Sequence, residues 1–229
     1  MKLLALDTSS LACTVALRLG DELFERHEEQ AREHTRLLMP MIREVLQESG
    51  AELPDLDAIV LGNGPGSFIG MRIAASVAQG LAHGAGLKIV PVSSLAAVAA
   101  EAFAEARAEE VVVAQDAHMN EVYLGIFSRG AAGEPVAMSA EVLHGHEIIN
   151  DLAVSGAAAR IAAGQGWQRY PKLMAINKQH FYGESDVLYP RGRFLLTLGA
   201  AALAQGDFLL PQDIAPAYLR NKVAEKPAA

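Results

Sequence analysis

The stretch Gly62-Asn63-Gly64-Pro65-Gly66-Ser67-Phe68-Ile69-Gly70 decides how this chain folds. An apolar run, 58–61, leads into it, and a helix-like run of small residues, 71–83, leads out. Glycine accepts positive φ angles and lets a second backbone come close, whereas proline cannot continue a strand. The stretch therefore predicts a sharp turn from a strand into a helix, with Ser67 as the residue that caps the helix.

Such a turn presents free backbone N–H groups at a helix N-terminus, where anions bind. A tight turn that binds no ligand is the other interpretation, because glycine-rich turns between strands and helices are common in α/β folds. The stretch matches neither a phosphate-binding P-loop nor a dinucleotide fingerprint. No Gly-Lys-Ser/Thr follows it, and the glycine spacing is wrong.

The composition limits the classes of function. The chain has 229 residues, of which 51% are hydrophobic, so it can form one large or two small domains with a sizeable core. A net charge of −8, without a cluster of lysine or arginine, argues against a nucleic-acid-binding surface on this chain alone. The single cysteine, Cys13, excludes an internal disulfide and is expected to be buried. We find no signal peptide or membrane-spanning run, and therefore expect a cytoplasmic protein without a membrane contact.

The first half of the chain has the pattern of a ribonuclease-H-like unit. Hydrophobic periodicity predicts strands at 3–6, 12–19 and 23–28, a helix over 33–48, a strand at 56–61, a helix over 68–83, a strand at 88–92 and a helix over 95–106. Three strands followed by alternating helices and strands are typical of the unit that is duplicated in the actin-like ATPase fold.

A second unit begins in the same way, as a weak internal repeat. Strands are predicted at 111–115, 121–127, 135–143 and 160–164, followed by an irregular stretch, 167–189, and a helix over 191–205. The sequence thus predicts an α/β, actin-like ATPase fold with two lobes, the second degenerate. The N-terminal lobe covers 1–108, and the C-terminal lobe covers 109–220, with its late helix a candidate to pack on the first lobe. The tail, 221–229, is expected to be disordered.

Two helices carry side chains suited to close contact. In the helix over 68–83, Gly70, Ala74 and Ala78 repeat every four residues and form a ridge of small side chains. In the helix over 33–48, Leu37 and Met41 lie on the apolar stripe, and methionine adapts its shape easily. The ridge can pack against the protein's own sheet, since helices in α/β folds cover a sheet face, or it can contact a second subunit.

Five segments carry a resemblance to a known family. They are Leu6-Asp7-Thr8-Ser9, Arg32-Glu33-His34-Thr35, Gly62 to Gly70, Asp116 with Glu121-Val122-Tyr123, and Tyr218-Leu219-Arg220. Over essentially its whole length the chain resembles the bacterial TsaB (YeaZ) family of tRNA threonylcarbamoyladenosine biosynthesis proteins. That family usually has threonine where this chain has Ile69, and Arg-Gly where it has His118 and Asn120. A hydroxyl at position 69 and a cation at position 118 are therefore not indispensable.

The resemblance implies membership in a complex with TsaD and TsaE. That complex transfers a threonylcarbamoyl group to N6 of adenosine 37 in tRNAs that read codons starting with A. In the family TsaD is the catalytic paralogue, TsaB its partner and activator, and TsaE a small ATPase. ATP and a metal are accordingly expected on the partner subunits, and no cofactor on this chain.

A non-catalytic scaffold is therefore the predicted function. We expect Leu37, Met41, Gly70, Ala74 and Ala78 to form the surface that binds TsaD. The same face is expected to form a homodimer when TsaD is absent, because exposing such a patch is unfavourable. Contact with tRNA is expected only through the complex. A charge on the ridge, Ala74→Glu, is expected to abolish TsaD binding while the fold survives.

The residues also test for chemistry in this chain itself. The catalytic paralogue carries a His-x-x-x-His metal pair on the helix after the strand that corresponds to 88–92. Here the two positions are Ser94 and Val98, and valine has no lone pair, so no metal site and no catalytic residue are predicted.

Asp7 and Thr8 are candidates for nucleotide binding, because actin-like ATPases hold Mg²⁺ and phosphate with an aspartate on the first strand. The turn that follows lacks a glycine for close backbone approach, and a capped turn is the other interpretation. An ATPase with a vestigial nucleotide site, or a protease-like enzyme of the actin-like superfamily, is the alternative function.

Overall fold

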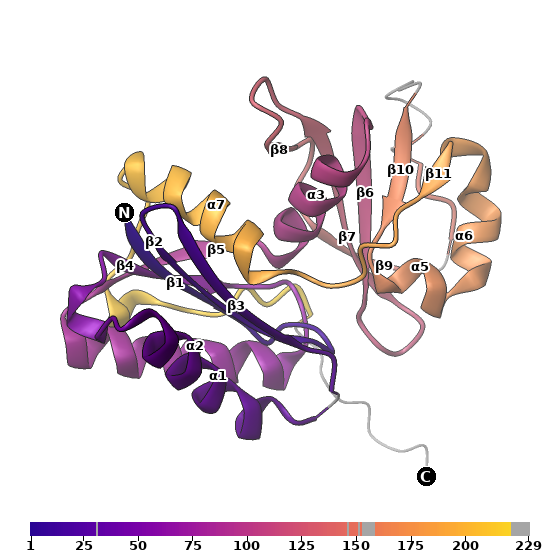
Figure 1. Cartoon of the computed structure of the whole chain (residues 1–229). Coiled ribbons are helices and arrows are strands. Elements are labelled where there is room, and N and C mark those ends of the chain that lie inside the picture. The colour runs from indigo at the N-terminus through magenta and orange to yellow at the C-terminus, as the bar shows by residue number, and fades with distance from the viewer. Residues whose placement is uncertain (31, 146, 151, 153–158, 221–229) are drawn as a thin grey trace, which may run out of the picture.

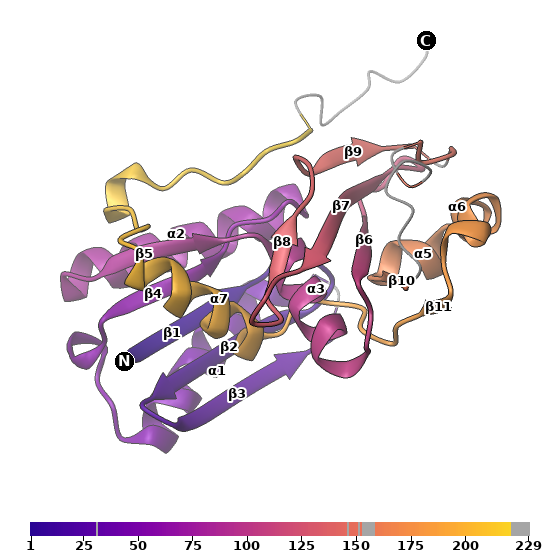
Figure 2. The same ribbon diagram turned by 90° about the horizontal axis from the view of Figure 1, so that it is seen from above.

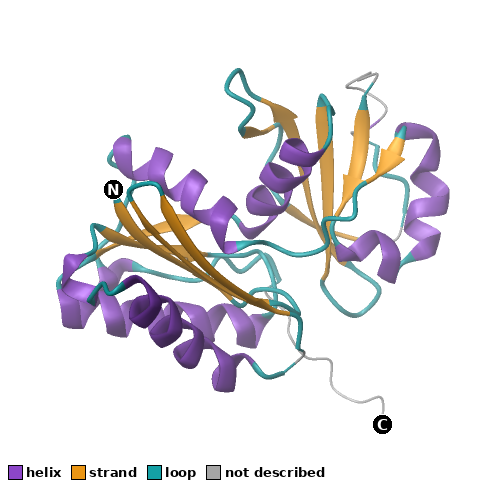
Figure 3. Ribbon diagram, viewed as in Figure 1, coloured by secondary structure: helices purple, strands orange, loops and turns teal. Residues whose placement is uncertain are grey.

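The computed structural model describes residues 1–30, 32–145, 147–150, 152 and 159–220. The predicted disordered tail, 221–229, lies outside these residues. Two β-sheets lie side by side in two lobes, and helices cover both faces of each sheet (Figures 1 and 3). Within the described ranges, no helix is long and apolar enough to span a membrane.

The first sheet has the strand order β3-β2-β1-β4-β5. Its strands are β1 (Lys2–Asp7), β2 (Cys13–Leu19), β3 (Glu22–Glu28), β4 (Ala58–Gly62) and β5 (Lys88–Val92). The first three form an antiparallel meander, and β4 and β5 continue the sheet in parallel with β1. The central strands are apolar because both faces are covered by helices. These strands and their order confirm the predicted unit.

Helices α1 (His34–Ser49) and α2 (Phe68–Ala85) cover one face of the first sheet. Helix α7 (Gly192–Ala204) covers the other face (Figure 1). Each of the three begins and ends within one or two residues of the predicted range. A helix that packs one face against a sheet has apolar residues at a regular spacing, and this spacing can be recognised in the sequence. Cys13 is 0% exposed within this core, as predicted.

The second sheet repeats the first. Its strand order is β11-β10-β6-β7-β8, with β9 also paired to β7, and its antiparallel and parallel pairs follow the same pattern. The strands are β6 (Glu110–Asp116), β7 (Val122–Arg129), β8 (Pro135–Ala137), β9 (Val142–His144), β10 (Arg160–Ala163) and β11 (Gly183–Glu184). The predicted internal repeat is confirmed. The single strand predicted over 135–143 is wrong, because β8 and β9 are separate strands.

The stretch 167–189, predicted to be irregular, contains helices α5 (Gln165–Arg169) and α6 (Pro171–Asn177) as well as β11. Helix α5 is too short to show a period. Its indole, Trp167, donates to the Val112 carbonyl oxygen at 3.1 Å and packs edge-on against Phe181. In the described ranges, single 3₁₀ turns also lie at Leu53–Asp55, Lys178–His180 and Pro211–Asp213.

The third helix of each repeat packs on the sheet of the other repeat. Helix α3 (Ser94–Glu105) follows β5 but lies against β6 and β7, whereas α7 follows the second sheet but lies across β1 and β2 (Figure 2). The two helices also contact each other. The predicted lobe boundary after residue 108 stays a prediction. Helix α3 precedes this residue in the sequence but already packs on the second sheet, so sequence order and packing give different boundaries.

Candidate functional site

The glycine-rich stretch packs directly on the turn that joins β1 to β2. Ser67 donates its backbone N–H to the Ser9 carbonyl oxygen at 2.6 Å, and the Thr8 hydroxyl donates to the Gly70 carbonyl oxygen at 2.6 Å. A Cβ atom at Gly66 would lie 2.2 Å from the Ser9 oxygen, and one at Gly70 would lie 1.9 Å from the Thr8 oxygen. The glycines are therefore required by a contact between two turns of the same chain. The predicted helix cap is confirmed, because the Gly70 N–H donates to Ser67 Oγ at 3.2 Å.

Asp7 is enclosed by this contact and is 0% exposed. One carboxylate oxygen accepts from the Ser9 N–H at 2.6 Å, and the other accepts from Ser94 Oγ at 2.5 Å. Burial raises the pKa of the Asp7 carboxyl above its ordinary value, although these hydrogen bonds act in the opposite direction. Thr8 is also 0% exposed, and its hydroxyl is used by Gly70. Neither side chain reaches solvent, so the structure gives no support to nucleotide binding by Asp7 and Thr8, which stays a prediction.

At neutral pH the buried, charged carboxylate of Asp7 is expected to lower the free energy of unfolding. Replacing Asp7 by the neutral asparagine is expected to remove this destabilisation. Because the pKa of Asp7 is raised on folding, the folded state holds this proton more tightly than the unfolded chain does. Stability from the neutral carboxyl is present below the unfolded pKa of 3.8 and is lost as the pH rises through the folded pKa. Urea unfolding at pH 7.5 should therefore show Asp7→Asn at least as stable as the wild type, with a gap that narrows toward pH 4.

Asp7→Ala is the matched control for this prediction. It leaves the Ser9 N–H and the Ser94 hydroxyl without the carboxylate, which should cost about 1–3 kcal/mol of unfolding free energy at both pH values. A stability difference between wild type and Asp7→Asn that does not change with pH would contradict the raised pKa of Asp7.

The predicted partner-binding residues lie in the core of the first lobe. Met41 is 4% exposed, Ala74 and Ala78 are 0% exposed, Gly70 is buried, and the half-buried Leu37 packs against the same core. The small side chains let α2 lie close to its own sheet, which was the other interpretation of the ridge. The prediction of a docking ridge is therefore wrong. Ala74→Glu would bury a charge and disrupt folding.

Helices α1 and α2 expose an apolar groove between them. Its apolar side chains on α2 each come one residue before those of the predicted ridge. Its volume is about 480 Å³. The groove is lined by Thr35, Leu38, Met39, Ile69, Arg72, Ile73, Ser76 and Val77. Ile69, Ile73 and Val77 follow the same spacing of four residues as Gly70, Ala74 and Ala78. Ile69 is 70% exposed, the largest exposed fraction among the large hydrophobic side chains that the structure describes. The sequence thus shows the spacing of four residues on α2. Only the fold shows which of the two adjacent stripes of the helix is buried and which is exposed.

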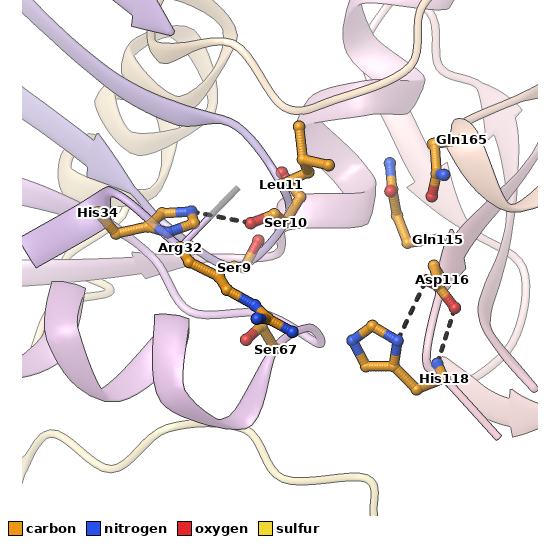
Figure 4. A pocket seen from close by; sticks show the side chains of 10 residues that line it. All are labelled: Ser9, Ser10, Leu11, Arg32, His34, Ser67, Gln115, Asp116, His118 and Gln165. Atoms are coloured by element: carbon orange, nitrogen blue, oxygen red, sulfur yellow. Dashed lines mark hydrogen bonds and ion pairs between the residues drawn. The ribbon is translucent and has the colours of Figure 1, made fainter. Parts of the chain in front are cut away.

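A second cavity, of about 230 Å³, lies between the two lobes (Figure 4). It is lined by Ser9, Ser10, Leu11, Arg32, His34, Ser67, Gln115, Asp116, His118 and Gln165. Asp116, at the end of β6, accepts from the His118 N–H and the Tyr170 hydroxyl at 2.7 Å each, and it pairs with the His118 ring at 3.3 Å. Burial and the bond to Asp116 raise the pKa of Tyr170 to about 12, so Tyr170 keeps the proton that it donates.

The β6–β7 turn on the far side of this cavity has a strained backbone. Three consecutive residues have φ angles in the left-handed region, which is unfavourable for residues other than glycine. They are His118 (59°), Met119 (56°) and Asn120 (62°). Arg220 supports this turn, because its guanidinium donates to the Ala117 carbonyl oxygen at 2.9 Å and pairs with Glu121 at 2.5 Å.

The segment that carries Arg220 also contacts the start of α2. Arg72 donates to the Tyr218 hydroxyl at 2.7 Å and stacks over the Phe68 ring at 3.6 Å. The segment thus joins the glycine-rich turn of the first lobe to the β6–β7 turn of the second. Sequence reasoning noted Tyr218-Leu219-Arg220 only as part of a resemblance, and no local pattern indicates this bridge.

Three further positions bear on catalysis. Burial raises the pKa of the Cys13 thiol to about 12, so this cysteine is not a nucleophile at neutral pH. Ser94 is 2% exposed and bonded to Asp7, and Val98 is 0% exposed in the core of the second lobe. At the two positions where the catalytic paralogue has its metal-binding histidines, this chain therefore has buried side chains that take part in packing and hydrogen bonding within the protein.

Comparison with known proteins identifies the family. A family model described as TsaD, tRNA N6-adenosine threonylcarbamoyltransferase, matches residues 26–225. The tRNA threonylcarbamoyladenosine biosynthesis protein TsaB of Haemophilus influenzae is 38% identical and covers 99% of this chain and 96% of its own length. The chain belongs to the TsaB family. The Escherichia coli TsaB protein is 35% identical over 99% of this chain and 97% of its own length.

Solved structures of the TsaB (YeaZ) family have the same fold. YeaZ from Pseudomonas aeruginosa is 37% identical, with a TM-score of 0.86 over 95% of this chain and 99% of its own. A second P. aeruginosa structure, described as an uncharacterized protein with similarity to peptidase YEAZ, is 36% identical, with a TM-score of 0.85 over 96% of this chain and 99% of its own. The predicted two-lobed, actin-like α/β fold is confirmed.

Proposed function

We propose that this chain acts in tRNA threonylcarbamoyladenosine biosynthesis as the non-catalytic partner of a TsaD-type subunit. Membership in the TsaB family supports the pathway. The observation that carries the mechanism is the apolar groove between α1 and α2, in which Ile69 is 70% exposed. A stripe of apolar side chains along a helix fits a helix of a partner protein, because such a partner buries the stripe over its whole length.

The groove belongs to a lobe that a TsaD-type paralogue shares, since the TsaD family model matches this chain itself. Two such lobes can pair α1 and α2 of one with α1 and α2 of the other. The same geometry accepts a second copy of this chain, so we propose a homodimer when the catalytic subunit is absent. TsaE then joins the assembled pair, ATP and a metal act on the partner subunits, and tRNA meets this chain only within the complex.

The alternative function, an ATPase or a protease-like enzyme, has less support. A nucleotide site built on the first strand needs an accessible Asp7, but Asp7 is fully buried and its carboxylate is bonded to Ser9 and Ser94. A cysteine protease needs a thiolate, and burial keeps Cys13 protonated.

Reconstituted transfer of threonylcarbamoyl to tRNA tests the proposal. The reaction contains TsaD, TsaE, the adenylate-forming enzyme, ATP, bicarbonate, threonine and tRNA, with or without this chain. We expect modification to fall at least tenfold when the chain is omitted, and Asp7→Asn to restore it as well as the wild type does, because Asp7 is structural. The readout is modified adenosine per tRNA, measured by mass spectrometry of nucleosides.

Two outcomes would contradict the proposal. Equal modification with and without the chain would show that it is not a required partner. Full assembly with Asp7→Asn but no activity would show that Asp7 contributes chemistry, in support of the alternative.

A further inference from the structure

The end of the described chain, 206–220, is held on the first lobe by hydrogen bonds and by a buried side chain. Leu209 and Ile89 of β5 exchange two backbone hydrogen bonds, at 2.8 and 3.0 Å. Gln79 of α2 donates to the Ile214 carbonyl oxygen at 3.3 Å, and Ile214 is 7% exposed in the core of this lobe. The segment therefore follows the face of the first sheet that α2 covers (Figure 2, yellow).

The last two residues of this segment are held on the second lobe instead. Leu219 packs against the core that α3, β6 and β7 form, and Arg220 bonds to the β6–β7 turn. The chain thus crosses from one lobe to the other between Ile214 and Leu219. Five residues of extended chain span at most roughly 17 Å, so this crossing limits how far the lobes can separate.

Tyr218 shortens the crossing further. Its hydroxyl accepts from Arg72 Nε at 2.7 Å, and its ring lies 5.3 Å from the Phe68 ring. Phe68 and Arg72 both belong to α2, so Tyr218 is fixed to the first lobe although its neighbour Leu219 is fixed to the second. While these contacts hold, the two attached residues are adjacent in the chain, and their Cα atoms are only about 3.8 Å apart.

The lobes are also joined on the opposite face of the first sheet. There α7 covers the sheet and contacts α3, which packs on the second sheet. A joint on one face alone would let the lobes rotate about it, whereas joints on both faces fix their mutual orientation. The contacts of Tyr218 therefore decide whether the second joint is tight or slack.

Arg72 connects Tyr218 to the groove between α1 and α2. The Arg72 side chain is exposed and lines that groove. Its Nε is used by Tyr218, but neither Nη atom has a hydrogen-bond or ion-pair partner among the residues that the structure describes. A carboxylate that enters the groove on a partner helix can therefore pair with Arg72 without displacing Tyr218, and such a pair holds the guanidinium in place.

We propose that residues 206–220 form a clasp between the lobes, that Tyr218 is its releasable contact, and that a partner in the groove keeps the clasp closed by pairing with Arg72. The clasp is a property of the isolated chain, and only its control by a partner rests on the proposed function. A partner that binds better to the closed form shifts the lobes toward that form, and release of Tyr218 weakens its binding in return.

The distance between two nitroxide spin labels, one on each lobe, tests the clasp. The labels are attached to cysteines that replace Asp21, in the β2–β3 turn, and Ala175, on α6, which are both exposed. Cys13 is 0% exposed and stays unlabelled. Double electron–electron resonance on the full chain should give one main distance and a minor, broad component, because a single hydrogen bond contributes little net stability.

Tyr218→Ala should enlarge the broad component at least threefold. Tyr218→Phe keeps the ring contact, loses only the hydroxyl, and should give an intermediate fraction. Gln212→Ala is the matched control, because Gln212 lies in the same segment and is exposed, and its side chain makes no hydrogen bond among the described residues. It should match the wild type. Equal distance distributions in the wild type and Tyr218→Ala would overturn the clasp.

The TsaD-type subunit, added at saturation, tests the control by the groove. The broad component should disappear from the wild type and persist in Tyr218→Ala, with binding of both verified by calorimetry. Its disappearance from both proteins would overturn control through Tyr218, because the subunit would then join the lobes itself. Absence of any binding would contradict the proposed function and the partner control with it, whereas the distances in the free chain would still decide the clasp.

Discussion

Replacing Gly70 by alanine is expected to lower the free energy of unfolding by about 3–5 kcal/mol. The added Cβ atom would lie 1.9 Å from the Thr8 carbonyl oxygen. This atom belongs to the backbone at the buried end of the first sheet, so it cannot rotate away as the end of a side chain can. Separating the two segments would also break the hydrogen bond from the Thr8 hydroxyl to Gly70. Guanidinium unfolding followed by circular dichroism measures the loss.

Gly80→Ala in the same helix is the matched control. A Cβ atom at Gly80 meets nothing within 4 Å, and alanine restricts the unfolded chain and favours a helix. That variant should therefore gain about 0.5–1 kcal/mol. Equal stability of the two variants would mean that the contact between the two turns is not what requires glycine at position 70.

Ile69→Asp should weaken binding to the TsaD-type subunit about 30-fold or more, as expected for a charge placed in the apolar centre of an interface. Ile69 is 70% exposed in the isolated chain, so the substitution removes little packing within the protein. The residue is the second of helix α2, where an acidic side chain interacts favourably with the helix dipole. Folding should survive, and isothermal titration calorimetry should report the loss of affinity.

Two variants make this result specific. Ile69→Thr introduces the residue that the TsaB family usually has at this position, and it should bind within about threefold of the wild type. Tyr182→Asp introduces the same charge at a side chain of the second lobe that is 61% exposed, and it should not affect binding. Unchanged affinity of Ile69→Asp would remove the groove from the interface.

The sequence was sufficient for the fold of the first lobe because its elements are long and their burial is regular. The apolar period of α2 was correct, yet the sequence could not distinguish the stripe that contains Ala74 from the stripe that contains Ile73. Small residues suit both a close contact within the chain and a close contact with a partner, and only the position of the sheet decides between them.

Other features depended on contacts between residues far apart in the chain. Helix α5 is held by Trp167 and its bond to β6, and five residues give no period to read. Asp7 had the identity and position expected of a phosphate site, but the Ser94 bond that encloses it links residues 87 positions apart. The bridge made by Arg220 is equally non-local, since it reaches the β6–β7 turn from the end of the described chain.

The exchange of α3 and α7 between the two sheets makes each half of the chain depend on the other. A chain with only the first repeat would end after α3, with that helix directed away from its own sheet and one face of the sheet bare. Two copies of such a chain could cover both sheets only by exchanging their third helices in a dimer. The rate and the extent of dimer formation would depend on the protein concentration. Joining the repeats in one polypeptide replaces that bimolecular encounter with an intramolecular one. The present chain is thus equivalent to an intertwined dimer whose two halves are joined in one polypeptide, and each half lacks a layer that only the other half supplies.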